Sequence, residues 1–243
     1  MCGVLSAIAL TPSAPVLVPE LAGGAAAEVA EFRAAALTAA AELPERWIAV
    51  GVGTTGQVIG PDTRGTFAGY GVDVPVALSP DAGPAMSALP LCALFTGWLR
   101  GQANPAARAE VRVYDADLDA DSAVARGRAL RAEIDAAADA VGVLVVADGA
   151  HTLTPAAPGG FDPDAAPVQA ALDDALASGD AAALIRLPAG IVGRVAYQVL
   201  AGLVEPGPWA AKELVRGAPY GVGYFVGVWV PAGWGAASGE STE

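Results

Sequence analysis

Short apolar segments alternate with longer alanine-rich segments along most of the chain. The clearest pair is an amphipathic stretch at 122–140 followed directly by an apolar run at 141–147. Further apolar runs, each read as a strand, lie at 4–10, 47–52, 72–78, 111–114 and 221–230. Further helical stretches lie at 25–43, 87–100, 165–177 and 181–203, the last broken near Pro188 and Gly190. Strands that alternate with helices predict a largely parallel central sheet with helices on both faces.

The chain shows no internal repeat and no linker. We therefore expect a single α/β domain over residues 1–230, followed by a flexible C-terminal tail over residues 231–243. The run at 72–78 contains Pro75, which cannot donate to a sheet, so this strand is expected at an edge.

Composition excludes several classes of partner. The net charge is −13, and the 13 basic residues form no cluster, so nucleic acid is not expected as a partner. Although 54% of residues are hydrophobic, polar residues, Pro or Gly interrupt every apolar stretch before the roughly 20 residues of a spanning helix, so no membrane partner is expected. The two cysteines, Cys2 and Cys92, form no CxxC pair, which favours a reduced cytoplasmic protein. A homo-oligomer is compatible with these data.

The chain has one histidine, His151, in the phrase Ala-Asp-Gly-Ala-His-Thr-Leu-Thr-Pro at 147–155. Zinc sites with several imidazoles, and iron sites with two histidines and a carboxylate, cannot be built from it. His151 could act as a lone acid or base, with Asp148 orienting it, or it could cap the loop after the strand at 141–147. The sequence leaves both interpretations open.

Three other motifs carry little weight. The acidic cluster 115–121 lacks the turn glycine and the distal glutamate of a calcium loop. Residues 51–56 spell GxGxxG, but no helix follows to hold a pyrophosphate. The GxSxG elbow of serine hydrolases is missing from the sequence.

Three ordered segments resemble the class III extradiol ring-cleavage dioxygenase superfamily, including its Memo-like branch. Residues 9–21 resemble the opening strand and its Pro-His-Pro-Pro loop. Residues 145–163 are similar to the Gly-Asp-x-Ser-His loop and its trailing Pro-x-Gly-[Phe/Tyr]-Asp-Pro. Residues 218–226 (Ala-Pro-Tyr-Gly-Val-Gly-Tyr-Phe-Val) resemble the closing strand. The resemblance implies this family's fold and a pocket at the carboxyl ends of the strands.

The same resemblance implies that the iron site is lost. Active relatives bind Fe(II) through two histidines and a carboxylate, and the matching positions here are Ser13, residues 53–56 and Gly217. Only the acid/base histidine of the third loop is retained, as His151. No metal and no cofactor are therefore expected.

These observations predict a degenerate relative that has become a non-oxygenase binding or interaction protein. Its pocket is expected to be lined by Ser13, Thr54, Thr55, His151 and Tyr224, and to accept a small aromatic or carboxylate ligand. Two alternatives stay open: a metal-independent enzyme that uses His151 as acid or base, and a dioxygenase with an unrecognised ligand set.

Overall fold

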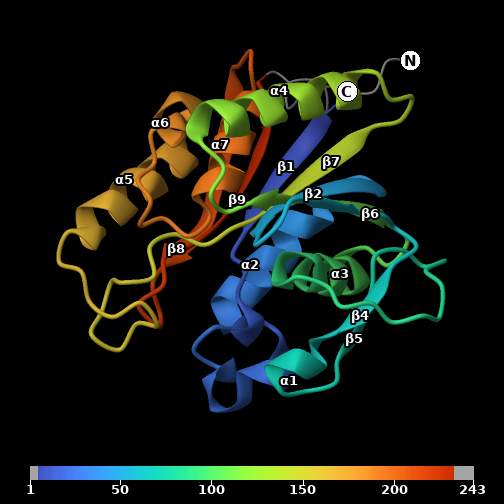
Figure 1. The fold of residues 1–243 in the computed structure, drawn as a ribbon, viewed down its shortest axis with the longest axis horizontal. Helices are drawn as coiled ribbons and strands as arrows, with labels where there is room; N and C mark the ends of the chain where they lie inside the picture. Colours follow the sequence, from blue (N-terminus) through green and yellow to red (C-terminus); the bar gives the residue numbers. More distant parts are fainter. Residues whose placement is uncertain (1–4, 233–243) are drawn as a thin grey trace, which may run out of the picture.

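The computed structural model describes residues 5–232, which form a seven-stranded sheet, a small two-stranded sheet and seven α-helices (Figure 1). The large sheet has the order β3-β6-β2-β7-β1-β9-β8. Its strands are β1 (Leu5–Thr11), β2 (Arg46–Gly53), β3 (Gln57–Ile59), β6 (Arg108–Asp115), β7 (Val141–Val146), β8 (Trp209–Gly217) and β9 (Tyr224–Pro231). The small sheet pairs β4 (Arg64–Thr66) with β5 (Pro75–Ala77). The helices are α1 (Pro19–Ala22), α2 (Ala30–Ala41), α3 (Leu91–Ala103), α4 (Ala120–Asp135), α5 (Ala165–Ser178), α6 (Ala181–Ile185) and α7 (Arg194–Leu203).

The sheet is mixed, which corrects the prediction of a largely parallel one. Strands β6, β2, β7 and β1 are parallel to one another and form the centre. On one flank β3 pairs antiparallel with β6; on the other, β9 pairs antiparallel with β1 and β8 pairs antiparallel with β9. The prediction fails at the flanks because no sequence pattern marks β3 and β8 as strands, and an apolar run such as β9 does not reveal its direction.

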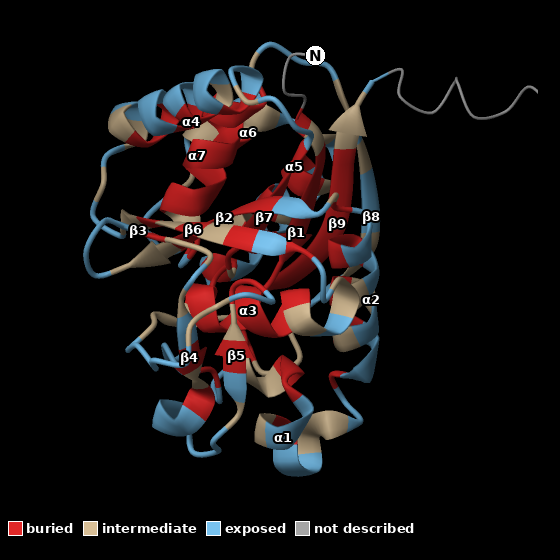
Figure 2. Cartoon of the chain, turned by 90° about the vertical axis from the view of Figure 1, so that its right-hand side faces the viewer, coloured by how far each residue is buried: buried red, intermediate tan, exposed pale blue. Residues whose placement is uncertain are grey.

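Helices cover both faces of the sheet, as predicted. Helices α2 and α3 pack on one face, while α4, α5 and α7 pack on the other and α6 packs against α5 and α7. Strand β7 lies between β2 and β1 and is covered on both sides, so all six of its residues are buried. Figure 2 shows the buried residues in the central strands and on the inner sides of the helices. A strand buried on both faces has a continuous apolar sequence, which is why the run at 141–147 predicts a strand so clearly.

Several helices and strands have other bounds in the structure than the sequence predicts. The helical stretch at 181–203 is two helices, α6 and α7, separated where Pro188 and Gly190 predict a break. The strand expected at 72–78 is only β5, and it belongs to the small sheet and not to an edge of the large one. The helix expected at 87–100 begins later, after Pro90, whose extended backbone precedes α3. Of the predicted tail, residues 233–243 lie outside the described part of the chain.

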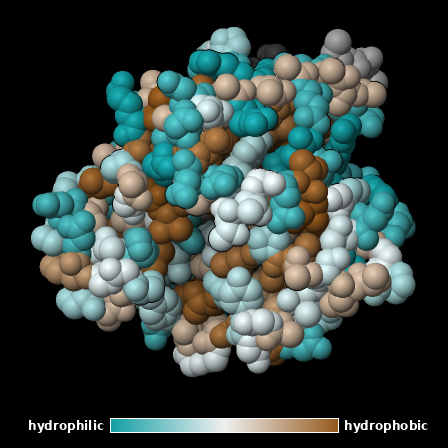
Figure 3. Space-filling view, in the orientation of Figure 1, coloured by the Kyte–Doolittle hydropathy of each residue, from teal (hydrophilic) through white to brown (hydrophobic). Residues whose placement is uncertain are grey.

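The outer surface carries most of the charge. Figure 3 shows hydrophilic residues over the top of the molecule, where α4 lies in Figure 1, and hydrophobic residues in strips between hydrophilic ones below it.

Within residues 5–232, no helix combines the length and the hydropathy needed to cross a bilayer.

Candidate functional site

The three segments that carry the family resemblance meet at the carboxyl ends of β1 and β7. Ala147 N–H donates to Thr11 O at 2.9 Å, which continues the parallel ladder by one residue beyond β7. The turn that leads into β9 joins from the other side, because Gly149 N–H donates to Gly223 O and Gly223 N–H donates to Ala150 O, both at 2.8 Å. Segments far apart in sequence are thus fixed to one another by main-chain hydrogen bonds.

Asp148 lies at the centre of this junction. Its Oδ1 accepts the Ser13 N–H at 2.9 Å, so the first and third loops of the resemblance are joined directly. Within residues 5–232 this is the only hydrogen bond that the Asp148 carboxylate receives, and no basic side chain forms an ion pair with it. Burial raises the pKa of Asp148 to about 6, and the Ser13 amide opposes that shift only in part.

The charge of Asp148 acts on two tyrosines, Tyr197 and Tyr224, and Tyr220 interacts with the second of them. The hydroxyl of Tyr197 on α7 donates to Ala147 O at 2.9 Å. Burial, followed by the negative charge of Asp148, raises the pKa of Tyr197 and also that of Tyr224 at the start of β9. Tyr220, in the turn before β9, donates to Glu28 Oε2 at 2.9 Å and raises the pKa of Tyr224 further. We call Ser13, Asp148, Tyr197, Tyr220 and Tyr224 the Asp148 cluster.

A buried glutamine fixes the loop that carries Asp148. Gln169 on α5 accepts the Ala150 N–H through Oε1 at 2.7 Å and donates through Nε2 to Asp173 Oδ1 at 2.8 Å. The amide fits between two glycines, since a Cβ on either Gly149 or Gly223 would stand 2.1 Å from Gln169 Oε1. Burial also raises the pKa of Asp173 to about 6, against the opposing effect of the Gln169 hydrogen bond.

His151 lies in the same loop but makes no hydrogen bond with Asp148. Its carbonyl accepts the Gly159 N–H at 3.0 Å, and a Cβ on Gly159 would stand 2.4 Å from the imidazole Cδ2, so this part of the loop folds over the ring. The imidazole Nδ1 is buried and has no hydrogen-bond partner among residues 5–232. Asp148 therefore does not orient His151 in this structure, since the imidazole Nδ1 forms no hydrogen bond with it or with any other described residue.

The predicted site residues are only partly brought together. Ser13, Asp148 and Tyr224 belong to one cluster, and His151 lies in its central loop. Thr54 and Thr55 follow β2 at the same edge of the sheet, but both are exposed in the turn that leads to β3. The cluster also depends on residues that the sequence did not point to, namely Gln169, Asp173, Tyr197 and Tyr220.

The residues that the sequence resemblance matches to iron ligands do not suit iron. Gly217 in β8 has no side chain, Ser13 offers a hydroxyl, and the threonines after β2 are exposed. Among residues 5–232, no group of three or more His, Cys, Asp and Glu side chains is placed to hold a metal ion. A two-histidine, one-carboxylate iron site cannot be assembled from this set.

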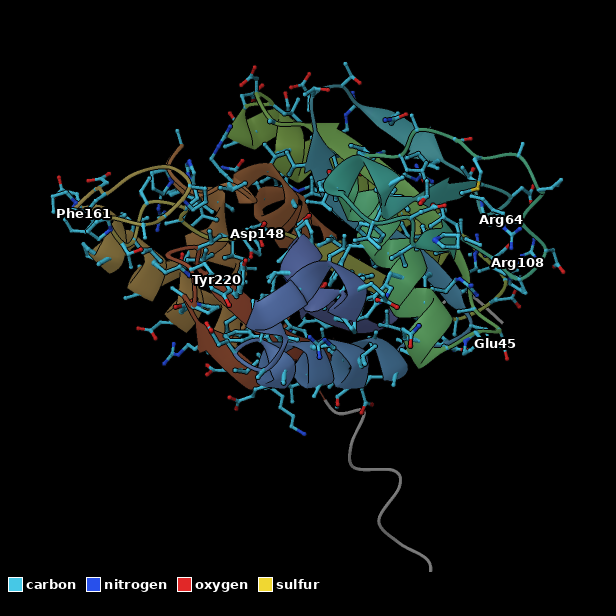
Figure 4. The ribbon with its side chains drawn as sticks, turned by 90° about the horizontal axis from the view of Figure 1, so that it is seen from below. Glu45, Arg64, Arg108, Asp148, Phe161 and Tyr220 are labelled. Atoms are coloured by element: carbon cyan, nitrogen blue, oxygen red, sulfur yellow. The ribbon has the colours of Figure 1, made fainter. Side chains whose placement is uncertain are left out.

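Two cavities are lined by residues outside the Asp148 cluster. One of about 620 Å³ opens at the amino ends of β2 and β6, beside Glu45 and Arg108. Another of about 510 Å³ lies between β3, β6 and α4, beside Tyr114 and Arg126. Figure 4 places Asp148 and Tyr220 in one half of the molecule and Glu45 and Arg108 in the other. The Asp148 cluster is thus separate from both cavities.

Comparison with known proteins supports the fold only. No family model matches the chain, and no curated protein matches its sequence. The structure is similar to the crystal structure of an uncharacterized protein, JW3007, from Escherichia coli K12. The TM-score is 0.57 at 12% identity, over 93% of this chain and 99% of that one. The arrangement of the α/β domain therefore occurs in a solved structure at very low sequence identity.

Proposed function

We propose that this chain is an extradiol dioxygenase-like protein whose iron site has degenerated, and that it binds a small organic molecule at the Asp148 cluster. The observation that carries the proposal is the hydrogen bond from Ser13 N–H to Asp148 Oδ1. It joins two of the family-like loops at the carboxyl ends of the central parallel strands, where ligands bind in open α/β sheets.

The chemistry of Asp148 favours a binding role. A carboxyl group with a pKa near 6 and no cationic partner is destabilising in the ionised form. Carboxyl groups with pKa values raised by burial cluster at functional sites. Asp148 and Ser13 are half-buried, not fully enclosed, at the carboxyl end of the central strands.

Metal-independent acid/base catalysis is the second candidate, and one observation favours it. A carboxyl with a pKa of about 6 is partly protonated near neutral pH and can both accept and donate a proton. In this version Asp148 carries the proton in place of His151, whose Nδ1 is buried and without a partner among the described residues.

The test is a thermal-shift screen of the full chain and of Asp148→Asn against small aromatic alcohols, amines and carboxylic acids. We expect at least one compound to raise the melting temperature of the wild type by several degrees and to lose that effect in the variant. A catechol-cleavage assay with added Fe(II) is run beside it and is expected to show no ring opening. Ring cleavage, or compounds that stabilise both proteins equally, would contradict the proposal.

A further inference from the structure

A third cavity, of about 260 Å³, lies between α3 and the small sheet. It is lined by β5 and the last two turns of α3, together with Arg64 of β4 and Glu20 of α1. Gly101 of α3 also lines it, and a Cβ at this glycine would have no heavy atom within 4 Å, so the space beside the helix is open. The volume lies just below the range of roughly 300–1,000 Å³ of drug-sized sites, which limits a ligand to a small molecule.

Arg100 brings a buried cation to this cavity. Only 7% of the residue is exposed. Its Nε donates to Ala77 O at 2.8 Å, and its Nη1 donates to Pro105 O at 2.6 Å and to Ala107 O at 3.4 Å. These bonds use every N–H of Nε and Nη1, whereas Nη2 has no acceptor among residues 5–232. Three carbonyls thus fix the guanidinium and leave one of its nitrogens unused.

The unused nitrogen is open to the cavity. Within the described part of the chain, the polar side-chain atoms that are both fully enclosed and without a partner belong to Thr11, Ser79 and His151. Nη2 of Arg100 is therefore not sealed by protein, and the cavity is the open space that Arg100 lines. A guanidinium held in one position by its other nitrogens presents this donor without a further loss of side-chain freedom.

The charge of Arg100 is not compensated by an acidic side chain. Within residues 5–232, the arginines that form ion pairs are Arg108, Arg112, Arg128, Arg131 and Arg216. A buried charge without a counter-charge is costly, and a bound anion would offset that cost.

Arg64 adds a second positive charge to the same cavity. Strand pairing places it opposite Ala77, the residue whose carbonyl binds Arg100 Nε. Its side chain is exposed and forms no ion pair within the described residues. Two arginines and one carboxylate, Glu20, thus line the cavity, although the net charge of the chain is −13. Figure 4 shows Arg64 in the half of the molecule away from Asp148.

The rest of the lining is apolar. Val76 and Trp98 are buried, and the Trp98 ring stacks on Phe95 with 5.6 Å between the ring centroids. A fixed arginine fork binds a carboxylate well, because the two N–H groups match the spacing of the two oxygens. The buried hydrocarbon surface suits an apolar group on the same molecule, and Glu20 disfavours an anion of higher charge such as phosphate.

We propose that this cavity binds a small organic carboxylate, whose oxygens accept hydrogen bonds from Arg100 Nη2 and whose apolar group packs against Val76 and Trp98. Arg64 contributes to the attraction from the exposed side. This site is separate from the Asp148 cluster, and the inference does not depend on the function proposed for that cluster.

The experiment compares benzoate, its uncharged analogue benzamide, and inorganic phosphate. Each is titrated at pH 7 into the ¹⁵N-labelled full chain, and the backbone amide of Gly101 and the Nε–H of Arg100 are followed. The Ser13 amide reports on the Asp148 cluster, because it donates to Asp148 Oδ1. We expect saturable shifts of Gly101 and Arg100 with benzoate, binding at least tenfold weaker with benzamide, no saturation with phosphate, and no shift of Ser13.

Two variants locate the site. Gly101→Leu places a side chain in the open space beside α3 and is expected to weaken benzoate binding at least tenfold, while leucine is a better helix former than glycine. Arg64→Gln is expected to weaken it severalfold, because one of the two positive charges is lost. The matched control is Arg126→Gln, an exposed arginine beside the cavity between β6 and α4, which is expected to change nothing.

Arg100→Lys keeps the charge but loses the paired donors, so it is also expected to weaken benzoate binding at least tenfold. This substitution removes hydrogen bonds to carbonyls that hold the fold. Gly101→Leu leaves those bonds in place and is therefore the variant that decides the question.

The outcomes separate this inference from the proposed function. Equal affinity for benzoate and benzamide, tighter binding of phosphate, or benzoate binding that survives Gly101→Leu would overturn the carboxylate site, as would no saturable shift at Gly101. Benzoate shifts at Ser13 that are lost in Asp148→Asn would place the ligand at the Asp148 cluster instead. A carboxylic acid bound at the α3 cavity stabilises Asp148→Asn as well as the wild type, and its loss in Gly101→Leu distinguishes it from a ligand of the cluster.

Discussion

The side chain amide of Gln169 lies against the bare α-carbon of Gly223, so close that a Cβ there would stand 2.1 Å from Gln169 Oε1. A Cβ on Gly149 would stand at the same distance from the same oxygen. The two glycines make room for the one side chain that satisfies the Ala150 N–H, and through it they hold the loop that carries Asp148.

The first prediction concerns this contact. Gly223→Ala should destabilise the fold by about 2–4 kcal/mol, because Gln169 must leave its position and the buried Ala150 N–H then has no acceptor. The measurement is urea unfolding. Gly60→Ala, at a glycine where an added Cβ would have no heavy atom within 4 Å, should change stability by less than about 1 kcal/mol.

A double-mutant cycle checks the cause. Gly223→Ala in a Gln169→Ala background should cost at least about 1 kcal/mol less than in the wild type, because the clashing amide has been removed. Additive effects of the two substitutions would mean that Gln169 is not the group that excludes a side chain at position 223.

The second prediction follows from the pKa of Asp148. Its folded-state pKa of about 6 lies above the value of about 3.9 for an unfolded chain, so between these two pH values the folded state retains a proton that the unfolded state has lost. The stability that this proton contributes is fully present below about pH 4 and is lost as the pH rises through 6. Asp148→Asn should therefore be more stable than the wild type by about 1–2 kcal/mol at pH 7.5 and equal to it at pH 3.5. Urea unfolding at a series of pH values measures the difference, and a variant less stable at pH 7.5 would argue against it.

The third prediction compares buried Gln169 with half-buried His151, whose Nδ1 is buried. Gln169→Leu removes the acceptor of a buried N–H and should cost about 1–3 kcal/mol. His151→Leu removes a ring whose buried Nδ1 has no partner among the described residues, so no hydrogen bond is lost there and the cost should stay below about 1 kcal/mol. Thermal and urea unfolding of both variants measure the two losses of stability. A loss of about 2 kcal/mol or more in His151→Leu would favour the structural cap that the sequence left open.

The fourth prediction concerns the contact between α4 and α7. A Cβ on Gly127 would stand 2.0 Å from Val199 O, and one on Gly202 would stand 2.1 Å from Val124 O, so the two helix backbones touch. Gly127→Ala should cost about 2 kcal/mol or more, since backbone cannot move aside as a flexible side chain would. Gly101→Ala in α3, where nothing lies within 4 Å, should instead stabilise the protein by up to about 1 kcal/mol.

Much of the central layer could be predicted from the sequence, because strands buried on both faces are continuous apolar runs. Strand β8 could not, since its residues Trp209–Gly217 are exposed or half-buried and include Lys212 and Glu213. The antiparallel flanks depend on pairings between distant segments, which leave no local pattern. The prediction of an α/β architecture is confirmed, whereas the sheet is mixed and not largely parallel.

For the site, sequence resemblance placed Ser13 and Asp148 in loops that the structure brings into contact. Gln169 could not be found in the same way, because it occupies one position of an alanine-rich amphipathic helix and nothing nearby in sequence marks it as buried. The only sequence features that relate to Gln169 are the two glycines, Gly149 and Gly223, that leave space for its side chain. Their role cannot be recognised from the sequence, because the contact between them and Gln169 exists only in the folded chain.

The position of β1 has a consequence for how the protein is made. This strand leaves the ribosome first among those described, yet its two neighbours in the sheet are β7 and β9, which are synthesised much later. Until then both hydrogen-bonding edges of an apolar strand remain open, and the turn at 218–223 that completes the Asp148 cluster does not yet exist. A nascent chain thus carries an unpaired apolar strand until β7 and β9 have been made, and the Asp148 cluster is completed only in the last stage of synthesis.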